Sequence, residues 1–317
     1  MKKKSYGKKL LAWVLALAVS MTLVPVMGQR EVQAAKIMNA WDGETTEVPK
    51  TDENGTYQIS NGAELAWFAK KVNDGASSIN GELTDKIYLG DGTSQNKWLM
   101  IGDTAEHAYK GTFNGNGYTV YFLDAEISEE NPDVRYAGLF GVIDGGTISN
   151  VKVSGEVHNN YAAYKTEGKY EKLYIGSGGI AGYLKSGTIS GCTNYTETTM
   201  AGEALRRNAG GIVGICSGTV RRCVNNGTLS TKVRFAQHNI GGIAGMEVGP
   251  NAVIRYCENK EAVQGYYSVG GIAGGVYQGA AVQNCYNKAK IIGVDTIGGI
   301  AGGVNESSVY ADGTVKE

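Results

Sequence analysis

Aspartate is scarce in the repetitive part of this 317-residue chain, where only Asp295 and Asp312 occur after residue 144. Enzymes that cleave polysaccharides use paired carboxylates, or a calcium site built from aspartates beside a basic residue. Glu247, Glu258 and Glu261 lie near one another in the sequence, but charged residues at outward positions are normally just solvated. The sequence therefore supplies no residue that we assign as catalytic.

The sequence also lacks the common metal-binding patterns. It contains no Cys-x-x-Cys pair, and its three histidines, His107, His158 and His238, lie in unrelated contexts, where a surface position is the default expectation. Within the repeats, no Gly-free segment of ten or more residues shows a helical period of 3.6. We therefore expect neither a metal nor a cofactor, and a helical repeat is disfavoured.

Glycine, in contrast, is abundant, with 47 residues, and much of it recurs in motifs such as Gly-Gly-Ile-Ala-Gly at 270–274. The apolar residues of successive motifs are spaced by 41, 32, 31, 29 and 28 residues. Such a period indicates stacked units that share one continuous core. Polar loops predicted at residues 159–171 and 197–207 explain the long early spacings. The aligned apolar positions are Leu139, Ile180, Ile212, Ile243, Ile272 and Ile300.

A second pattern follows each glycine motif. A branched apolar residue is followed by Cys at +3 and Asn at +5, and this occurs four times. In the first unit, Ile148, Val151 and Val153 occupy these places. Because Val can replace Cys, the Cys position is expected to be buried and apolar rather than chemically active. The repeated residues are Cys192, Cys223, Cys257 and Cys285, with Asn194, Asn225, Asn259 and Asn287.

These periods predict an all-β fold in which the chain winds into a parallel β-helix with three strands per coil. Strands rise about 3.3 Å per residue, so three short strands and their corners account for a period of about 30 residues. Equivalent residues would stack about 4.8 Å apart along the axis. The Cys and Asn residues would then form two ladders, and the Asn amides would donate and accept along the axis and satisfy backbone groups at a corner.

Five cysteines are present in the chain, an odd number. We favour buried free thiols, because in-register parallel strands point neighbouring thiols the same way and fit disulfide geometry poorly. One or two disulfides and a metal site are the alternatives.

Several segments resemble the GLUG-motif repeat family of bacterial surface and secreted proteins. Ala-Gly-Leu-Phe-Gly at 137–141 is typical of the motif, and Trp98–Gly102 with Gly111–Val120 resembles the segment that precedes such repeats, although Asn114 and Tyr118 replace the usual Asp and His. The resemblance implies a right-handed, pectate-lyase-like β-helix and an extracellular setting. The family also occurs beside IgA-specific metallopeptidase domains, but no catalytic residue carries over, since this chain lacks His-Glu-x-x-His.

The sequence predicts three segments: a signal peptide at 1–34, an N-terminal polar segment with a capping helix at 35–80, and a β-helix with GLUG-type repeats at 81–317. Lysines precede an apolar run in the first segment, and a small-residue cleavage pattern ends it. Removing its six basic residues and one acidic residue changes the net charge from −1 to −6. We therefore expect no nucleic-acid partner and no membrane insertion of the mature chain.

Residues 62–73 are predicted to form the capping helix. Leu65, Phe68, Ala69 and Val72 fall on one face of it, as an amphipathic helix requires. A repeat fold needs such a cover, because its terminal strands otherwise present unpaired edges.

Tyrosines and arginines could form an outward binding surface if the coils stack, because tyrosine rings stack on sugars and arginines bind anions. Our leading hypothesis is a secreted or cell-surface scaffold or adhesive module of Gram-positive type, without catalytic activity, that binds glycan or a host surface protein. A polysaccharide lyase or glycoside hydrolase, and a non-catalytic module of a larger surface protease, are the alternatives. The candidate surface residues are Tyr256, Tyr266, Tyr267, Tyr277, Tyr286, Arg221 and Arg222.

Overall fold

The computed structural model describes residues 39–92, 96–128, 130, 133–160, 174–201, 207–231 and 238–305. The chain divides into two units, Met1–Asn39 and Ala40–Glu317. The predicted signal peptide at 1–34 lies outside the described residues. The second unit is described below.

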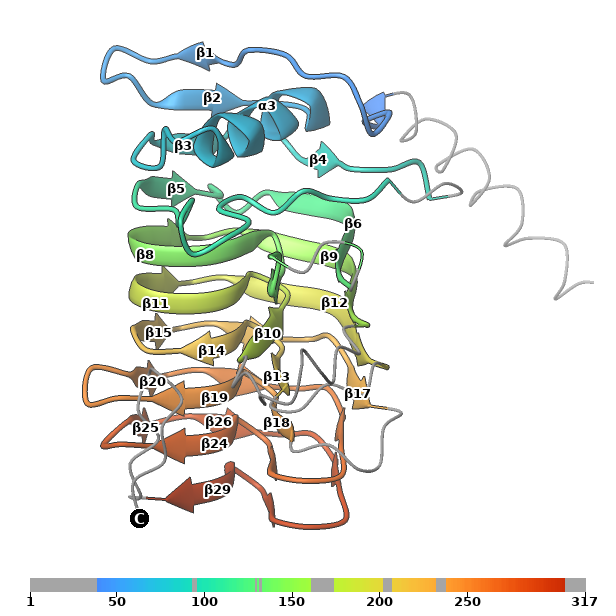
Figure 1. Ribbon diagram of the computed structural model, residues 1–317, viewed down its shortest axis with the longest axis vertical. Helices are drawn as coiled ribbons and strands as arrows, with labels where there is room; N and C mark the ends of the chain where they lie inside the picture. The colour runs from blue at the N-terminus through green and yellow to red at the C-terminus, as the bar shows by residue number, and fades with distance from the viewer. Residues whose placement is uncertain are drawn as a thin grey trace, which may run out of the picture. The chain divides into compact units, whose positions relative to one another are not determined.

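This second unit is a right-handed parallel β-helix, so the predicted fold class is confirmed (Figure 1). In the described ranges its strands form three sheets, and every strand pair is parallel except the antiparallel pair at the N-terminal end, β1 with β2. Sheet A contains β1 (Lys50–Thr51), β2 (Tyr57–Ile59), β3 (Gly81–Leu83), β5 (Thr112–Asn114), β8 (Phe140–Ser149), β11 (Ala181–Ser190), β14 (Val213–Cys216), β15 (Thr219–Arg221), β19 (Ala244–Val248), β20 (Val253–Arg255), β24 (Ala273–Tyr277), β25 (Ala281–Gln283) and β29 (Ala301–Asn305).

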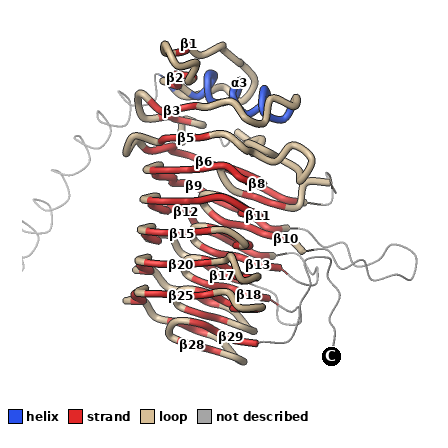
Figure 2. The backbone as a smooth tube through the Cα atoms, turned by 90° about the vertical axis from the view of Figure 1, so that its left-hand side faces the viewer, coloured by secondary structure: helices blue, strands red, loops and turns tan. Residues whose placement is uncertain are grey.

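Sheets B and C complete each coil, and Figure 2 shows the coils stacked one on another. Sheet B contains β4 (Ile87–Tyr88), β6 (Thr119–Ile127), β9 (Lys152–Asn159), β12 (Thr193–Met200), β16 (Val224–Asn225), β17 (Leu229–Thr231), β21 (Glu258–Asn259), β22 (Val263–Gln264), β26 (Tyr286–Asn287) and β27 (Ile291–Ile292). Sheet C contains β7 (Tyr136–Ala137), β10 (Ile175–Gly178), β13 (Arg207–Gly210), β18 (His238–Gly241), β23 (Val269–Gly270) and β28 (Ile297–Gly298).

From β7 onward each coil visits the three sheets in the order C, A, B, whereas the earlier coils have described strands in sheets A and B alone. The strands are more divided than the sequence predicts. The long strands β11 and β12 are each matched in the next coil by two short strands, β14 with β15 and β16 with β17. Sheet A therefore has two limbs in the later coils. The loop predicted at 197–207 is also too long, because β12 continues to Met200 in register with β9 and β13 begins at Arg207.

The N-terminal end of the coil stack is covered by α3 (Gly62–Asn73), as expected. Asn61 caps the helix by accepting a hydrogen bond from the Glu64 amide at 2.9 Å. Leu65, Phe68 and Val72 are fully buried and belong to the same core cluster as the interior of the coils. The helix thus closes the core with its apolar face.

The aligned apolar residues of the glycine motifs form the centre of this core. Leu139, Ile180, Ile212, Ile243 and Ile272 are fully buried. In the last coil that the structure describes, Ile300 is 42% exposed instead.

Asparagines stack at one edge of the core, where β12, β16, β21 and β26 pair in register. Each side-chain amide donates to the carbonyl of the next one, from Asn194 to Asn225 at 2.8 Å, from Asn225 to Asn259 at 2.8 Å and from Asn259 to Asn287 at 2.9 Å. The same amides bond backbone groups two residues later, such as the Gly227 amide and carbonyl. The backbone polar groups at this corner therefore find hydrogen-bond partners inside the core.

The asparagine ladder lies directly against the second glycine of each motif. A Cβ added to Gly211 would lie 2.3 Å from the Asn225 side chain, and one added to Gly242 would lie 2.3 Å from the Asn259 side chain. Gly179 faces Asn194 in the same way. These glycines are required for close approach, since no other residue leaves room for the amide.

The four repeat cysteines stack beside this ladder, Cys216 lies on β14 of sheet A, and all five cysteines are free in the structure. The backbone amides of Cys223 and Cys257 each donate to the sulfur of the cysteine one coil later, at 3.5 and 3.4 Å. Burial raises the pKa of the Cys223 thiol, and hydrogen bonding with Cys223 raises that of Cys257. These thiols stay protonated and act as apolar packing groups.

Replacing Asn225 by alanine should destabilise the protein by about 2–3 kcal/mol, because the amides of Asn194 and Asn259 and the Gly227 backbone each lose a buried partner. Urea unfolding of Asn225→Ala measures the loss. Asn226→Ala is the matched control, because this neighbouring side chain is only half-buried. Equal stability of the two variants would contradict a stabilising ladder.

Candidate functional site

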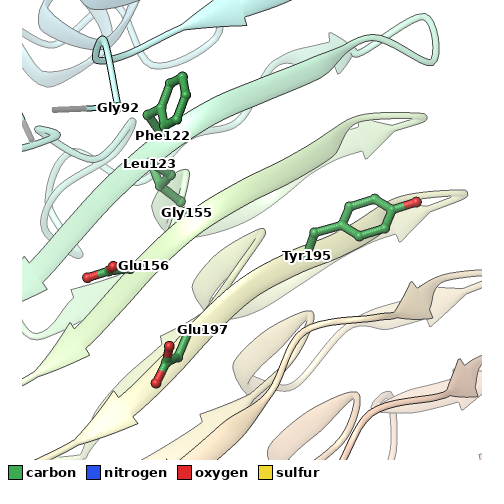
Figure 3. A pocket seen from close by; sticks show the side chains of 7 residues that line it. All are labelled: Gly92, Phe122, Leu123, Gly155, Glu156, Tyr195 and Glu197. Carbon is green, nitrogen blue, oxygen red and sulfur yellow. The ribbon is translucent and has the colours of Figure 1, made fainter. Parts of the chain in front are cut away.

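A cavity of about 250 Å³ opens on the outer face of sheet B, where β6, β9 and β12 run side by side (Figure 3). Its lining combines aromatic rings, carboxylates and two glycines that leave space. The lining residues are Gly92, Phe122, Leu123, Gly155, Glu156, Tyr195 and Glu197.

A β-bulge creates the cavity. Two residues of β6 lie between Val120 and Leu123, whereas one residue of β9 lies between their partners, Val153 and Gly155. The extra residue lets Phe122 turn outward with a φ of 59°, in the left-handed region. Gly155 has a φ of 137°, and a Cβ there would lie 2.2 Å from the Leu123 carbonyl oxygen. Only glycine therefore fits opposite the bulge.

Three carboxylates stack in register on neighbouring strands: Asp124 on β6, Glu156 on β9 and Glu197 on β12. Glu156 and Glu197 line the cavity, whereas Asp124 is buried and does not belong to its lining. Asp124 is bound by Lys97 at 3.2 Å. Glu156 lies 2.9 Å from the ring of His158. Glu197 is exposed and forms no ion pair or hydrogen bond with the other described residues. Of the three, Glu197 is therefore the one available to a ligand.

The flanking groups fix this arrangement. Lys97 also reaches Glu126 at 2.6 Å, and this hydrogen bond lowers the pKa of Glu126. His158 bridges Glu156 and the Thr199 hydroxyl, which lies 2.9 Å from its Nδ1. Lys97 thus holds Asp124 and Glu126, and the imidazole of His158 holds Glu156.

Two aromatic rings stand at the cavity rim. Phe122 is 37% exposed and Tyr195 is 48% exposed. The Phe122 ring packs beside Tyr88, with centroids 6.2 Å apart, and a Cβ on Gly92 would approach it to 3.3 Å. Exposed rings beside hydrogen-bond acceptors are suited to a sugar, whose apolar face stacks on the ring while its hydroxyls donate to carboxylates.

No group of three or more histidine, cysteine or acidic side chains suited to a metal ion occurs in the described ranges. The part of the chain that the structure places also contains no helix with the length and apolar character needed to cross a bilayer.

The predicted tyrosine surface is not one surface. Tyr277 lies on sheet A, half-buried, and donates to Asn239 at 2.9 Å. Tyr286 lies on sheet B and is 66% exposed. Tyr256 occupies a corner, and Tyr266 and Tyr267 lie in the turn before sheet C. The structure therefore separates these five residues over different faces.

The basic residues divide in a similar way. Arg221 and Arg222 lie at the end of one limb of sheet A, where Arg221 is half-buried and Arg222 is exposed. Arg207 and His238, in contrast, are buried neighbours in sheet C. The prediction of a surface position is wrong for His238, which is buried because its strand, β18, lies between β13 and β23 in sheet C.

The sequence analysis missed the cavity residues. Tyr195 and Glu197 alternate with the buried residues Asn194, Thr196 and Thr198. This period-2 pattern indicates a strand with an outward face. The predicted loop at 197–207 obscured the pattern.

Comparison with known proteins identifies one sequence motif and the fold. A family model described as the GLUG motif matches residues 265–292. Residues 265–292 are a GLUG motif. This motif contains β23, β24, β25, β26 and β27, so it is one full circuit of the three sheets, and the resemblance inferred from the sequence is confirmed.

A crystal structure from Bacteroides ovatus shares this fold. That protein carries the provisional designation immunoglobulin A1 protease, and it matches with a TM-score of 0.50 and 19% identity over 80% of this chain and 73% of its own. No curated protein matches the chain in sequence.

Inside the coils, next to the GLUG motif, lies a buried carboxyl group. Glu247 of β19 stacks between Cys216 and Val276 and is fully buried, and neither of its oxygens completes a hydrogen bond. The backbone amides of Ile254 and Ala281 lie nearby and offset the burial only in part. Burial raises the pKa of Glu247 to about 9, so the group is neutral at pH 7.

Glu247 should make stability fall as pH rises. The unfolded carboxyl ionises above pH 4.5 while the folded one keeps its proton to about pH 9. The contribution of Glu247 to the free energy of unfolding is therefore fully present below pH 4.5. It is lost as the pH rises from 4.5 to about 9, by up to about 1.4 kcal/mol per pH unit. Between about pH 5 and about pH 8, the free energy of unfolding of Glu247→Gln should rise relative to that of wild type by on the order of 3 kcal/mol. Urea unfolding at the two pH values measures this difference. Parallel pH profiles would contradict this.

Proposed function

We propose that the chain is a secreted or cell-surface β-helix module that binds a neutral or amino-sugar glycan in the cavity on sheet B. The GLUG motif and the shared fold support a surface β-helix module. The cavity supports the glycan, because it combines hydrogen-bond acceptors with exposed rings on a rigid sheet.

One observation carries the proposal: the two exposed rings of Phe122 and Tyr195 and the unpartnered carboxylate of Glu197 border a single cavity. An aromatic ring offers a platform for the apolar face of a sugar, and a carboxylate is a strong acceptor for its hydroxyls. The carboxylates of Glu156 and Glu197 line the cavity and repel an anionic sugar, so the cavity selects against uronic acids and sulfated sugars.

The cavity also supports a second candidate function, glycoside hydrolysis. Glu156 and Glu197 are in register on neighbouring strands, whose backbones lie about 4.8 Å apart along the stack, and both side chains line the cavity. Retaining glycosidases place their two carboxyl groups about 5–5.5 Å apart. Glu156 has His158 as a neighbour and Glu197 has no such partner, so the two carboxyl groups have different environments, as the two different catalytic roles require.

The binding proposal is tested with residues 35–317 on a glycan array, followed by titration calorimetry on the strongest neutral or amino-sugar hit. We expect Tyr195→Ala and Glu197→Gln each to weaken binding by about tenfold or more, which corresponds to about 1.4 kcal/mol. Tyr286→Ala and Glu261→Gln are matched controls, since both are exposed and lie outside the cavity.

The result decides between the candidates. Binding that both cavity variants lose and both controls keep supports a binding module. Release of reducing ends from the same glycan, abolished in Glu156→Gln and Glu197→Gln while binding persists, supports the hydrolase. Binding that is unchanged in every cavity variant, without release of reducing ends by the wild type, overturns both.

A further inference from the structure

A second outward surface lies on the other limb of sheet A, at the ends of β15 and β20. Arg221 and Arg255 occupy the same register position in neighbouring coils. The corner residues that follow them, Arg222 and Tyr256, are both exposed. We call these four residues the arginine patch.

The charges of the patch are not compensated. None of the ion pairs among the described residues involves Arg221, Arg222 or Arg255. The acid beyond the corner, Glu258, is already bound by Lys260 and Lys288. The Nε atoms of Arg221 and Arg255 are buried without a hydrogen-bond partner. Like charges directly opposite on neighbouring strands repel one another, so this arrangement costs stability.

The fold itself does not require arginine at these positions. The coils before and after carry Ser149, Ser190 and Gln283 at the register position of Arg221 and Arg255. All three are uncharged, so the backbone hydrogen bonding of this limb is compatible with a neutral side chain.

The corner makes the same point. Arg222 and Tyr256 adopt φ values of 52° and 56°, in the left-handed region. Neighbouring coils place Asn150, Gly191 and Asn284 at this corner, and these residue types adopt that conformation at lower cost. A large side chain there strains the backbone.

We propose that the arginine patch binds an anionic glycan, with its carboxylate or sulfate groups on the guanidinium groups. Arginine binds such oxyanions through paired N–H donors. Arg221 and Arg255 follow each other about 4.8 Å apart along the stack, so successive anionic groups of an extended chain can reach both. Tyr256, 54% exposed, offers a ring for a sugar face beside them.

This site goes beyond the cavity on sheet B. The two surfaces lie on different sheets and carry opposite charge, and they select opposite ligands. Either proposal can fail while the other holds.

The test uses residues 35–317 and two immobilised probes, heparin for sulfate and polygalacturonate for carboxylate, with dextran as the neutral reference. The patch variant combines Arg221→Ser, Arg222→Asn and Arg255→Ser, which are residues that this chain already uses at the same positions, so the fold should be kept. The control variant combines Lys50→Gln, Lys71→Gln and Lys86→Gln, which removes the same charge from exposed positions near the N-terminal end.

We expect wild type to bind at least one polyanion, with an affinity that falls as salt rises. The patch variant should lose at least tenfold in affinity and the lysine control less than twofold. Tyr195→Ala should bind the polyanion as wild type does, which separates this result from that for the cavity.

Three outcomes overturn the proposal. The first is no binding of either polyanion at low salt. The second is an equal loss in the lysine control, which shows attraction without a site. The third is binding of single-stranded DNA as tight as that of the polyanionic glycans, which shows that the patch does not select a sugar.

Discussion

The contact between a glycine and an asparagine of the same coil holds the coils in register. The amide of Asn225 occupies the space that a Cβ on Gly211 would need, and Asn259 does the same opposite Gly242. The amide then bonds its equivalent one coil away. A shift of one residue would break the whole ladder at once. Each hydrogen bond contributes only about 1 kcal/mol net, but a buried amide left unpaired costs more, so the ladder excludes other registers.

This contact explains why two sequence patterns recur together. The repeats, the winding of the chain and the helix at the N-terminal end follow from the sequence, because periodicity reports residues that stack on their equivalents. The contact across the coil between Gly211 and Asn225 could not be predicted from the sequence. Periodicity shows which residues of different coils are equivalent, but not which residues of one coil touch each other. It becomes visible only when the chain closes through the three sheets.

The cavity could not be predicted for a related reason. It depends on a bulge between Val120 and Leu123, in one of the first coils, where no equivalent in the later repeats marks the position. Phe122 then faces outward although strand alternation alone does not place it there. The burial of Arg207 was hidden likewise, because it rests on pairing between β13 and β18 rather than on residue type.

The stacked polar residues inside the coils are neutral and hydrogen-bonded or buried, so we expect ligand binding on the outer faces. The thiols are kept protonated, the amides are saturated by one another, and Glu247 is neutral at pH 7. Because the interior already fixes the register, the outer columns are free to vary from coil to coil. The earlier coils present carboxylates and rings on sheet B, and later coils present arginines on sheet A.

Backbone strain points to the same outer surfaces. Among the described residues, nine non-glycine residues have a left-handed φ. The aromatic or cationic ones are Phe122, Arg222 and Tyr256, and these belong to the cavity and to the arginine patch. Glycine or asparagine would relieve the strain at each position. Ser268, Gln278 and Thr296 are strained in the same way outside the two surfaces, so strain alone does not mark a site. At Phe122, Arg222 and Tyr256 it coincides with exposed rings and unpaired charge, and this combination is shared by both proposed surfaces.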